Sequence, residues 1–333
     1  MSAAELAAPA ASAAPADAAQ LLAVPGQIVP FGAEAGHVET PDGVRLRTAR
    51  FAPATRPARG TVMLVGGRAE AVEKYYETVR ALQERGFHVV SFDWRGQGLS
   101  ERIARDPALG HVETFDDYVI DLETVLTRMV LPDCRPPFFL LAHSMGGLVA
   151  LLAGPRITGR FKRMVLLTPL LAFGSSLPLP QRWIARVAAA ATFLGLGRLH
   201  ATARRKVTTW PFMGNVLTSD PQRHARWQAM IEARPQLSLG GPSFGWLHAA
   251  CRAMEEVRDP ARMAAQTVPT LIVSAGADRL VDSDVVEAYA HALRTGAHLP
   301  VRGARHEILL ERDEFREPFW AAFDAFVPGS GPF

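Results

Sequence analysis

The sequence has few cysteines. Cys134 and Cys251 are the only two among 333 residues, too few for a disulfide framework or a cysteine-based metal site. The spacing motifs of zinc sites, phosphate-binding loops and dinucleotide-binding turns do not occur in a fitting context either. The sequence therefore predicts a protein of a reducing compartment that needs no metal and no cofactor. We likewise expect no nucleic-acid partner.

Basic residues are missing from the start of the chain, where Arg45 is the first Lys or Arg. A secretory signal begins with a positive region and a transit peptide is rich in arginine, so the start of the chain matches neither. Its first 24 residues are rich in alanine and include Pro9 and Pro15, a composition typical of disordered segments. We expect a disordered tail over residues 1–30 and a cytoplasmic location.

Acidic residues are missing from a long internal stretch, since no Asp or Glu occurs between Asp133 and Asp220. The net charge of the whole chain is only +3, so this imbalance is local. Such a stretch favours contact with an anionic lipid surface, for example peripherally on the inner membrane face. The alternative is an ordinary solvated surface. The basic residues of the stretch are Arg135, Arg156, Arg160, Lys162, Arg163, Arg182, Arg186, Arg198, Arg204, Arg205 and Lys206.

Residues 136–155 carry no charged side chain and are numerous enough for a membrane span. Prolines at both ends and Gly146-Gly147 in the middle argue against one continuous helix. A strand, a tight turn and a buried helix explain the same run.

Ser144 lies at that turn, within Ala142-His143-Ser144-Met145-Gly146. A serine between a strand and a helix, with small residues two before and two after it, is typical of the nucleophile elbow of α/β-hydrolases. The match to G-x-S-x-G is complete except for Ala142. The N-terminus of the following helix would offer N–H groups to a developing oxyanion.

Strands and helices alternate on both sides of this motif, which is typical of a mostly parallel sheet with helices on both faces. A turn at Asp42-Gly43 adds a hairpin near the start. The alternation stops between Thr168 and Val257. We therefore expect an α/β core over residues 31–168 and 258–328, with residues 169–257 as an inserted helical lid. Strands are predicted at 60–65, 87–92, 163–167, 268–274 and 297–301, and helices at 70–85, 115–131, 285–293 and 314–326.

A nucleophilic serine needs a base, and the base needs an acid to hold its tautomer. In α/β-hydrolases the chain order is serine, acid, histidine. Asp278 and His306 follow Ser144 in this order, each just after a predicted strand. We predict Ser144, His306 and Asp278 as nucleophile, base and acid. Asp282 is the alternative acid, although its position before a helix predicts a cap.

Four other histidines compete for the role of base: His111, His143, His248 and His298. The turn geometry points His143 away from the nucleophile, and His111 precedes a helix, where a structural role is expected. Glu307 and Glu311 are further acidic candidates, with a neighbour of the base or a surface ion pair as the ordinary interpretation.

The oxyanion hole is predicted from two backbone N–H groups. One belongs to Met145, after the nucleophile, and the other to Arg68, in the Gly66-Gly67-Arg68 loop that follows the strand at 60–65. We expect the Arg68 side chain to turn outward. The lid is predicted to form the acyl pocket, with Trp183 and Trp246 as candidate substrate contacts.

Over residues 35–328, the chain resembles the bacterial lysophospholipase and monoglyceride-lipase-like branch of the α/β-hydrolases, of the serine aminopeptidase S33 type. Arg68 stands where the monoglyceride-lipase pattern has a small residue, so the resemblance is to the lysophospholipase side. The matching segments are 66–68, 74–77, 93–100, 115–118, 142–147, 217–221, 240–247 and 303–307.

The resemblance implies a serine esterase that cleaves a lipid with a single acyl chain, such as a lysophospholipid, through an acyl-enzyme. Alternatives are a monoacylglycerol lipase or a general carboxylesterase. An aminopeptidase, a thioesterase, a cofactor-free peroxidase or a non-catalytic ligand receptor would also fit the fold, because fold alone does not determine function.

Overall fold

The computed structural model describes residues 19–55, 57–202 and 211–328. Eight strands form one sheet in the order β1-β2-β4-β3-β5-β6-β7-β8. The hairpin β1–β2 is antiparallel, β2 pairs antiparallel with β4, and the other neighbours are parallel. The strands are β1 (Ala33–Glu39), β2 (Arg45–Phe51), β3 (Gly60–Val65), β4 (Phe87–Phe92), β5 (Phe138–His143), β6 (Arg163–Leu167), β7 (Thr270–Ala275) and β8 (Gly296–Val301).

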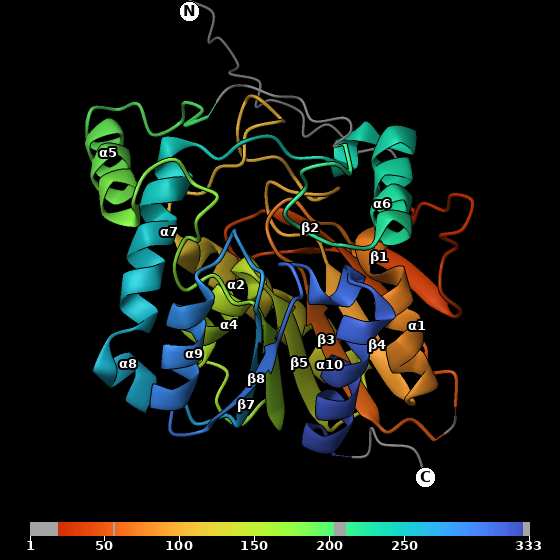
Figure 1. The fold of residues 1–333 in the computed structure, drawn as a ribbon. Coiled ribbons are helices and arrows are strands. Elements are labelled where there is room, and N and C mark those ends of the chain that lie inside the picture. The colour runs from red at the N-terminus through yellow and green to blue at the C-terminus, as the bar shows by residue number, and fades with distance from the viewer. Residues whose placement is uncertain (1–18, 56, 203–210, 329–333) are drawn as a thin grey trace, which may run out of the picture.

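Helices cover both faces of this sheet (Figure 1), which confirms the predicted fold class. Alternate residues of each strand point to opposite faces, so Met63 and Val65 belong to one buried cluster and Val62 and Leu64 to the other. The helices are α1 (Tyr76–Glu84), α2 (Phe115–Val125), α3 (Leu131–Asp133), α4 (Met145–Ala153), α5 (Gln181–Phe193), α6 (Pro221–Ala233), α7 (Phe244–Val257), α8 (Pro260–Ala264), α9 (Ser283–Ala292) and α10 (Asp313–Phe326).

The uncharged run at 136–155 forms β5, the turn at Ser144 and α4, as predicted. Every residue of α4 is buried, which explains the absence of charge. Within the described ranges, no helix has both the length and the apolar character needed to cross a bilayer.

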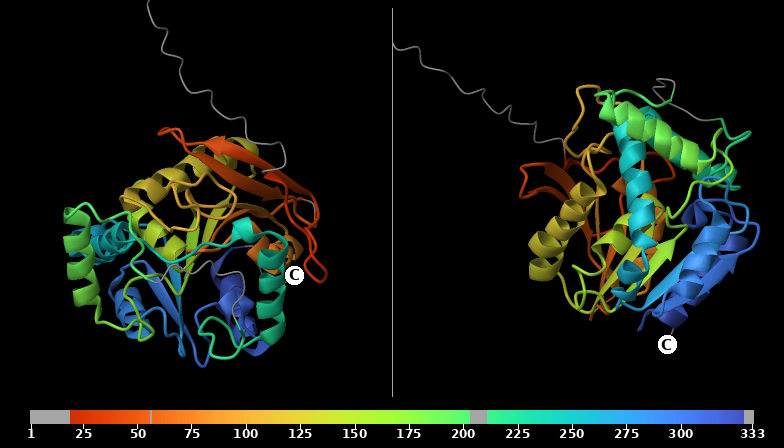
Figure 2. Two further views of the ribbon diagram at one scale, coloured as in Figure 1. Left: turned by 90° about the horizontal axis from the view of Figure 1, so that it is seen from above. Right: turned by 90° about the vertical axis from the view of Figure 1, so that its left-hand side faces the viewer.

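The segment between β6 and β7, predicted as a lid over residues 169–257, carries α5, α6 and α7. Helix α7 packs on α5 of this segment and also on α2 and α4. Its buried apolar residues, among them Trp246 and Val257, belong to the same cluster as those of α2 and α4. Helix α7 therefore connects α5 to the core, while α5 and α6 lie outside the two helical layers (Figures 1 and 2).

The predicted N-terminal tail also differs from the structure in its second half. Val24 is buried, Gln27 donates to the carbonyl of Glu73 at 3.1 Å, and the hydroxyl of Tyr76 donates to the carbonyl of Leu22 at 3.0 Å. Residues 19–30 thus lie on the core, held by side chains of the α1 region. Residues 1–18 lie outside the described part of the chain.

The segment 93–100, which matched the family pattern, is organised by the buried carboxylate of Asp93. This carboxylate pairs with Arg47 at 2.7 Å and accepts the N–H groups of Val72 at 3.0 Å and Leu99 at 2.7 Å. A Cβ atom on Gly98, where φ is +50°, would lie 2.2 Å from the Asp93 carboxylate oxygen. Since that carboxylate cannot move without losing its partners, only glycine fits there.

We predict that Gly98→Ala destabilises the protein by about 2–4 kcal/mol, because it adds a steric clash to the cost of a positive φ. Gly43→Ala is the matched control. Gly43 also has a positive φ (+84°), but its Cβ would meet no atom within 4 Å, so we expect a loss of about 1 kcal/mol. Urea unfolding of the two variants measures the difference, and equal losses would contradict the steric explanation.

Candidate active site

Ser144 adopts the backbone conformation of a sharp turn, with φ +52° and ψ −116°. Its N–H donates to the carbonyl of Leu167 at 2.9 Å, which anchors the turn to the end of β6. A Cβ atom on Gly146 would lie 2.6 Å from the carbonyl oxygen of Gly66. The turn therefore approaches the loop after β3 so closely that glycine is required two residues after the serine.

The structure brings the three predicted residues together from the ends of three strands. His306 Nε2 lies 2.9 Å from Ser144 Oγ, and His306 Nδ1 lies 2.7 Å from Asp278 Oδ2. The other carboxylate oxygen of Asp278 accepts the N–H groups of Leu280 at 2.8 Å and Val281 at 3.0 Å. This is the hydrogen-bond order required for a base that activates a serine.

The environment keeps Asp278 ionised. Burial acts to raise the pKa of its carboxyl group, but His306 and the two backbone amides outweigh burial and lower it. Asp282 instead accepts the N–H groups of Asp284 and Val285 and caps α9, as predicted. Of the competing histidines, His111 lies against Ser243 at 2.7 Å and His298 against Ser274 at 2.9 Å.

The loop after β3 is held on both sides of Arg68. The N–H of Gly67 donates to the Glu70 carboxylate, and the N–H of Ala69 donates to Gln97 at 2.7 Å. Trp94 Nε1 donates to the carbonyl of Gly66 at 2.8 Å. Trp94 and Gln97 of the family-matching segment 93–100 thus position the candidate oxyanion loop.

The two predicted oxyanion donors flank the nucleophile. A Cβ atom on Gly67 would lie 3.1 Å from Ser144 Cβ, so the loop packs directly on the serine. The Arg68 N–H has no acceptor among the described residues. Met145 is the first residue of α4, and the first N–H groups of a helix have no intrahelical acceptor. Both amides are therefore available to an oxyanion.

A buried charged cluster lies beneath this loop. Lys74 Nζ lies 2.8 Å from Glu70 and 2.5 Å from Glu307, and His143 Nδ1 lies 3.0 Å from Glu70. The Tyr75 hydroxyl also donates to the Glu70 carboxylate. Sequence reasoning missed this cluster, although Glu70 and Lys74 have the i, i+4 spacing of a helical ion pair.

Charge compensation sets the protonation states in the cluster. Burial acts to raise the pKa of Glu70, but Lys74 and His143 hold it well below its usual range. Burial acts to lower the pKa of Lys74, but Glu307 and Glu70 raise it. Of the two ordinary interpretations of Glu307 and Glu311, a surface ion pair is wrong because both side chains are buried, and Glu307 is a neighbour of the base, paired with Lys74. Glu311 accepts the N–H groups of Ser219 at 2.9 Å and Arg305 at 2.8 Å.

The Arg68 side chain does not turn outward as predicted. Its guanidinium donates to the carbonyl of Gly240 at 2.6 Å and lies over the ring of Trp246, 5.2 Å from the centroid. Trp246 is itself buried and donates from Nε1 to the Tyr118 hydroxyl at 3.2 Å. The other candidate substrate contact, Trp183, lies on α5 and is 46% exposed.

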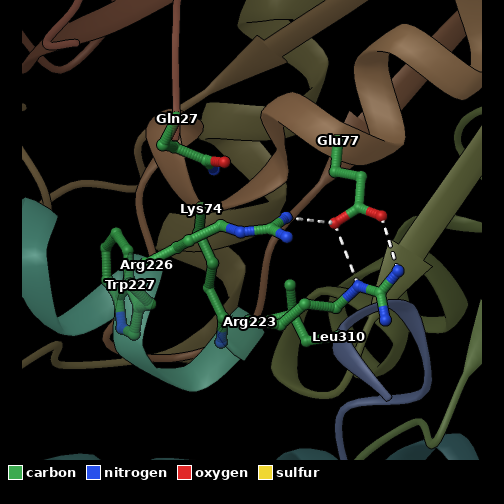
Figure 3. Close-up of a pocket in the computed structure, with 7 residues that line it drawn as sticks. All are labelled: Gln27, Lys74, Glu77, Arg223, Arg226, Trp227 and Leu310. Atoms are coloured by element: carbon green, nitrogen blue, oxygen red, sulfur yellow. Dashed lines mark hydrogen bonds and ion pairs between the residues drawn. The ribbon is translucent and has the colours of Figure 1, made fainter. Parts of the chain in front are cut away.

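Helix α6 is fixed to the core by ion pairs. Arg223 lies 2.7 Å from Glu77 on α1 and 2.7 Å from Asp313 on α10, and Arg226 lies 3.2 Å from Glu77. Figure 3 shows both arginines directed at the Glu77 carboxylate, beside a small pocket into which Lys74 points.

The segment that contains α5 differs from α6, because it exposes apolar side chains to solvent. Among the described residues, eight of the ten large exposed hydrophobic side chains belong to 179–213, and Phe193 is 92% exposed. They are Leu179, Trp183, Val187, Phe193, Leu194, Leu196, Leu199 and Met213.

Comparison with known proteins agrees with this geometry. Residues 56–313 match the model of the family described as serine aminopeptidase, S33. The chain belongs to this family. It is 35% identical to lysophospholipase L2 of Escherichia coli over 77% of this chain and 76% of that protein. It is 28% identical to a monoacylglycerol lipase of Mycolicibacterium smegmatis over 72% and 77% of the two chains.

Solved structures agree on the fold. The monoglyceride lipase of Saccharomyces cerevisiae superposes with a TM-score of 0.71 at 18% identity, covering 90% of this chain and 97% of that one. The monoacylglycerol lipase of Paleococcus ferrophilus gives 0.67 at 20% identity, covering 85% and 99%. The protein is thus an α/β-hydrolase and a hydrolytic enzyme of the serine esterase type, as the sequence predicted.

We predict that Ser144→Ala and His306→Ala each lower the turnover of a short aryl ester by about 10⁴-fold, because triad members act as one unit. Asp278→Asn should cost far more than Asp282→Asn, which removes only a helix cap. Initial rates of the four purified variants, with circular dichroism to check folding, measure this. Near-normal turnover in Ser144→Ala would exclude it as the nucleophile, and the reverse order of the two aspartates would assign the acid to Asp282.

Proposed function

We propose that this enzyme cleaves the carboxylic ester of a lipid with a single acyl chain, with lysophospholipids as the main substrate class. The observation that carries the proposal is the hydrogen-bonded series from Asp278 through His306 to Ser144 at a strained turn. It occurs in a chain 35% identical to a lysophospholipase over about three quarters of both proteins.

In this proposal, Ser144 Oγ attacks the ester carbonyl carbon while His306 Nε2 accepts its proton. The N–H groups of Met145 and Arg68 bind the oxyanion of the tetrahedral intermediate. Collapse expels the alcohol, which takes the proton from His306, and leaves an acyl group on Ser144. Water, deprotonated by His306, then attacks this acyl-enzyme and releases the fatty acid. Asp278 holds the imidazole tautomer throughout.

We further propose that residues 169–257 act as a lid over the acyl site, with Trp183 and Trp246 as candidate substrate contacts. The apolar character of α5 supports a lipid chain as the ligand. An aminopeptidase must bind a free α-ammonium group, which calls for a carboxylate near the site. Residues 134–219 supply none, and the carboxylates beside the triad, Glu70 and Glu307, are paired with Lys74, which favours the esterase over the peptidase.

The enzyme is expected to cleave a lysophosphatidyl lipid with a higher kcat/KM than any aminoacyl anilide, because α5 offers apolar surface and no acid for an amine. Steady-state assays of the wild type on both substrates, with Ser144→Ala as blank, measure this. A preference for the anilide would support the peptidase. Inactivity on both, together with a tightly bound ligand, would support the receptor alternative.

A peripheral position on the inner membrane face is the second part of the proposal. Phe193 and Leu194 are 92% and 70% exposed at the end of α5, and Arg182 and Arg186 are exposed on the same helix. Apolar side chains beside basic ones are typical of helices that lie in a membrane interface. Arg204, Arg205 and Lys206, which the sequence also places in the basic stretch predicted to contact anionic lipid, fall outside the described residues.

We predict that Phe193→Ser with Leu194→Ser weakens sedimentation with anionic vesicles about tenfold or more, because two exposed apolar side chains no longer insert. Hydrolysis of a short soluble ester should be unaffected. Phe31→Ser is the control, since Phe31 is 75% exposed but lies far along the chain from the lid, just before β1. Binding of the wild type should also weaken with salt. Equal binding to neutral and anionic vesicles at all salt concentrations would refute the proposed membrane surface.

A further inference from the structure

The Arg68 side chain is partly buried, with its guanidinium over the Trp246 ring, and it lacks a counter-ion among the described residues. Its Nε is buried and has no hydrogen-bond partner, and no carboxylate lies within ion-pair distance among the described residues. The carbonyl of Gly240 is its acceptor. Burial lowers the pKa of Arg68 to about 10, which still leaves it charged at neutral pH. A buried charge of this kind is costly unless something compensates it.

Two other arginines show how the charge of a guanidinium group is compensated in this protein. Arg47 pairs with Glu73 and Asp93, each within 2.7 Å. Arg102 has no carboxylate partner either, but it donates to three carbonyl groups, those of Gly96, Gly98 and Gln236. Arg68 has far fewer acceptors for the same charge, and most of its five N–H groups are left free.

The position of Arg68 relates its side chain to the reacting ester. Its own N–H is the proposed oxyanion donor, and the preceding Gly67 packs on Ser144. A fully extended arginine side chain reaches about 6–7 Å from its backbone at ordinary bond lengths. In a glycerol-based lysophospholipid, six bonds separate the ester carbonyl carbon from phosphorus, about 7 Å when extended. The two spans match.

We propose that the Arg68 guanidinium binds the phosphate group of the substrate headgroup and makes the enzyme prefer phosphate-bearing over neutral monoacyl esters. The planar fork of arginine donates two parallel hydrogen bonds to a phosphate. Gly110 keeps the space open, since a Cβ there would lie 2.2 Å from an Arg68 terminal nitrogen. This inference rests on the proposed function.

The test compares a lysophosphatidylglycerol with a monoacylglycerol of the same acyl chain, both below their micelle concentrations. We expect Arg68→Met to lower the ratio of the two kcat/KM values by about 10- to 100-fold, as for a lost charged hydrogen bond. Arg102→Met, the matched loss of a partly buried arginine with carbonyl partners, should change the ratio less than about twofold. A ratio unchanged in Arg68→Met would show that this arginine is only a clamp between its loop and Gly240, and would overturn the inference.

A second variant, Gly110→Ala, retains the charge of Arg68 but changes the position of its guanidinium. Gly110→Ala should displace the flexible guanidinium and lower the same ratio, whether or not Arg68→Met folds. In the wild type, inorganic phosphate should compete with the lysolipid more strongly than in Gly110→Ala, and equal competition would count against a phosphate site. If the wild type cleaves neither ester, the proposed function fails and this inference with it. If it cleaves both and the ratio is the same in both variants, only this inference fails.

Discussion

The buried carboxylate of Glu70 is the interaction on which the geometry of the site depends. It accepts the N–H of Gly67, contacts His143 next to the nucleophile, and pairs with Lys74, which in turn pairs with Glu307 next to the base. One carboxylate therefore joins the loops that follow β3, β5 and β8. A buried ionic group is a poor source of stability but an effective means of fixing one arrangement, because any other leaves charges unpaired.

A second buried carboxylate, that of Asp93, has a similar role for the loop that follows β3. Asp93 and Glu73 share Arg47, and the segment after Asp93 supplies Trp94 and Gln97 to the oxyanion loop. The candidate donor at Arg68 is thus placed by hydrogen bonds to its neighbours on either side. This explains why a substitution such as Gly98→Ala, which disturbs Asp93, should affect both stability and the loop that faces the ester.

The sequence predicted the sheet, the elbow and the strand ends that carry Asp278 and His306, because periodicity and chain order are local properties. It did not predict the inward turn of Arg68 or the burial of Glu307. Lys74 and Glu307 are separated by 233 positions, and no local pattern shows that two such side chains will meet. The packing of α7 on both α5 and α4 is likewise a contact between segments distant in the chain, which the helical pattern alone does not show.

The absence of acidic residues from 134–219 affects the surroundings of both Arg68 and α5. This stretch contributes no carboxylate to pair with Arg68 and no negative charge on α5 to repel a phosphate-bearing lipid. Helix α6 is anchored to the core, where Arg223 binds acids of α1 and α10, while α5 offers apolar side chains to its surroundings. An anionic, single-chain lipid would thus meet apolar and basic groups first and a desolvated arginine last, so the charge distribution and the site select for the same chemistry.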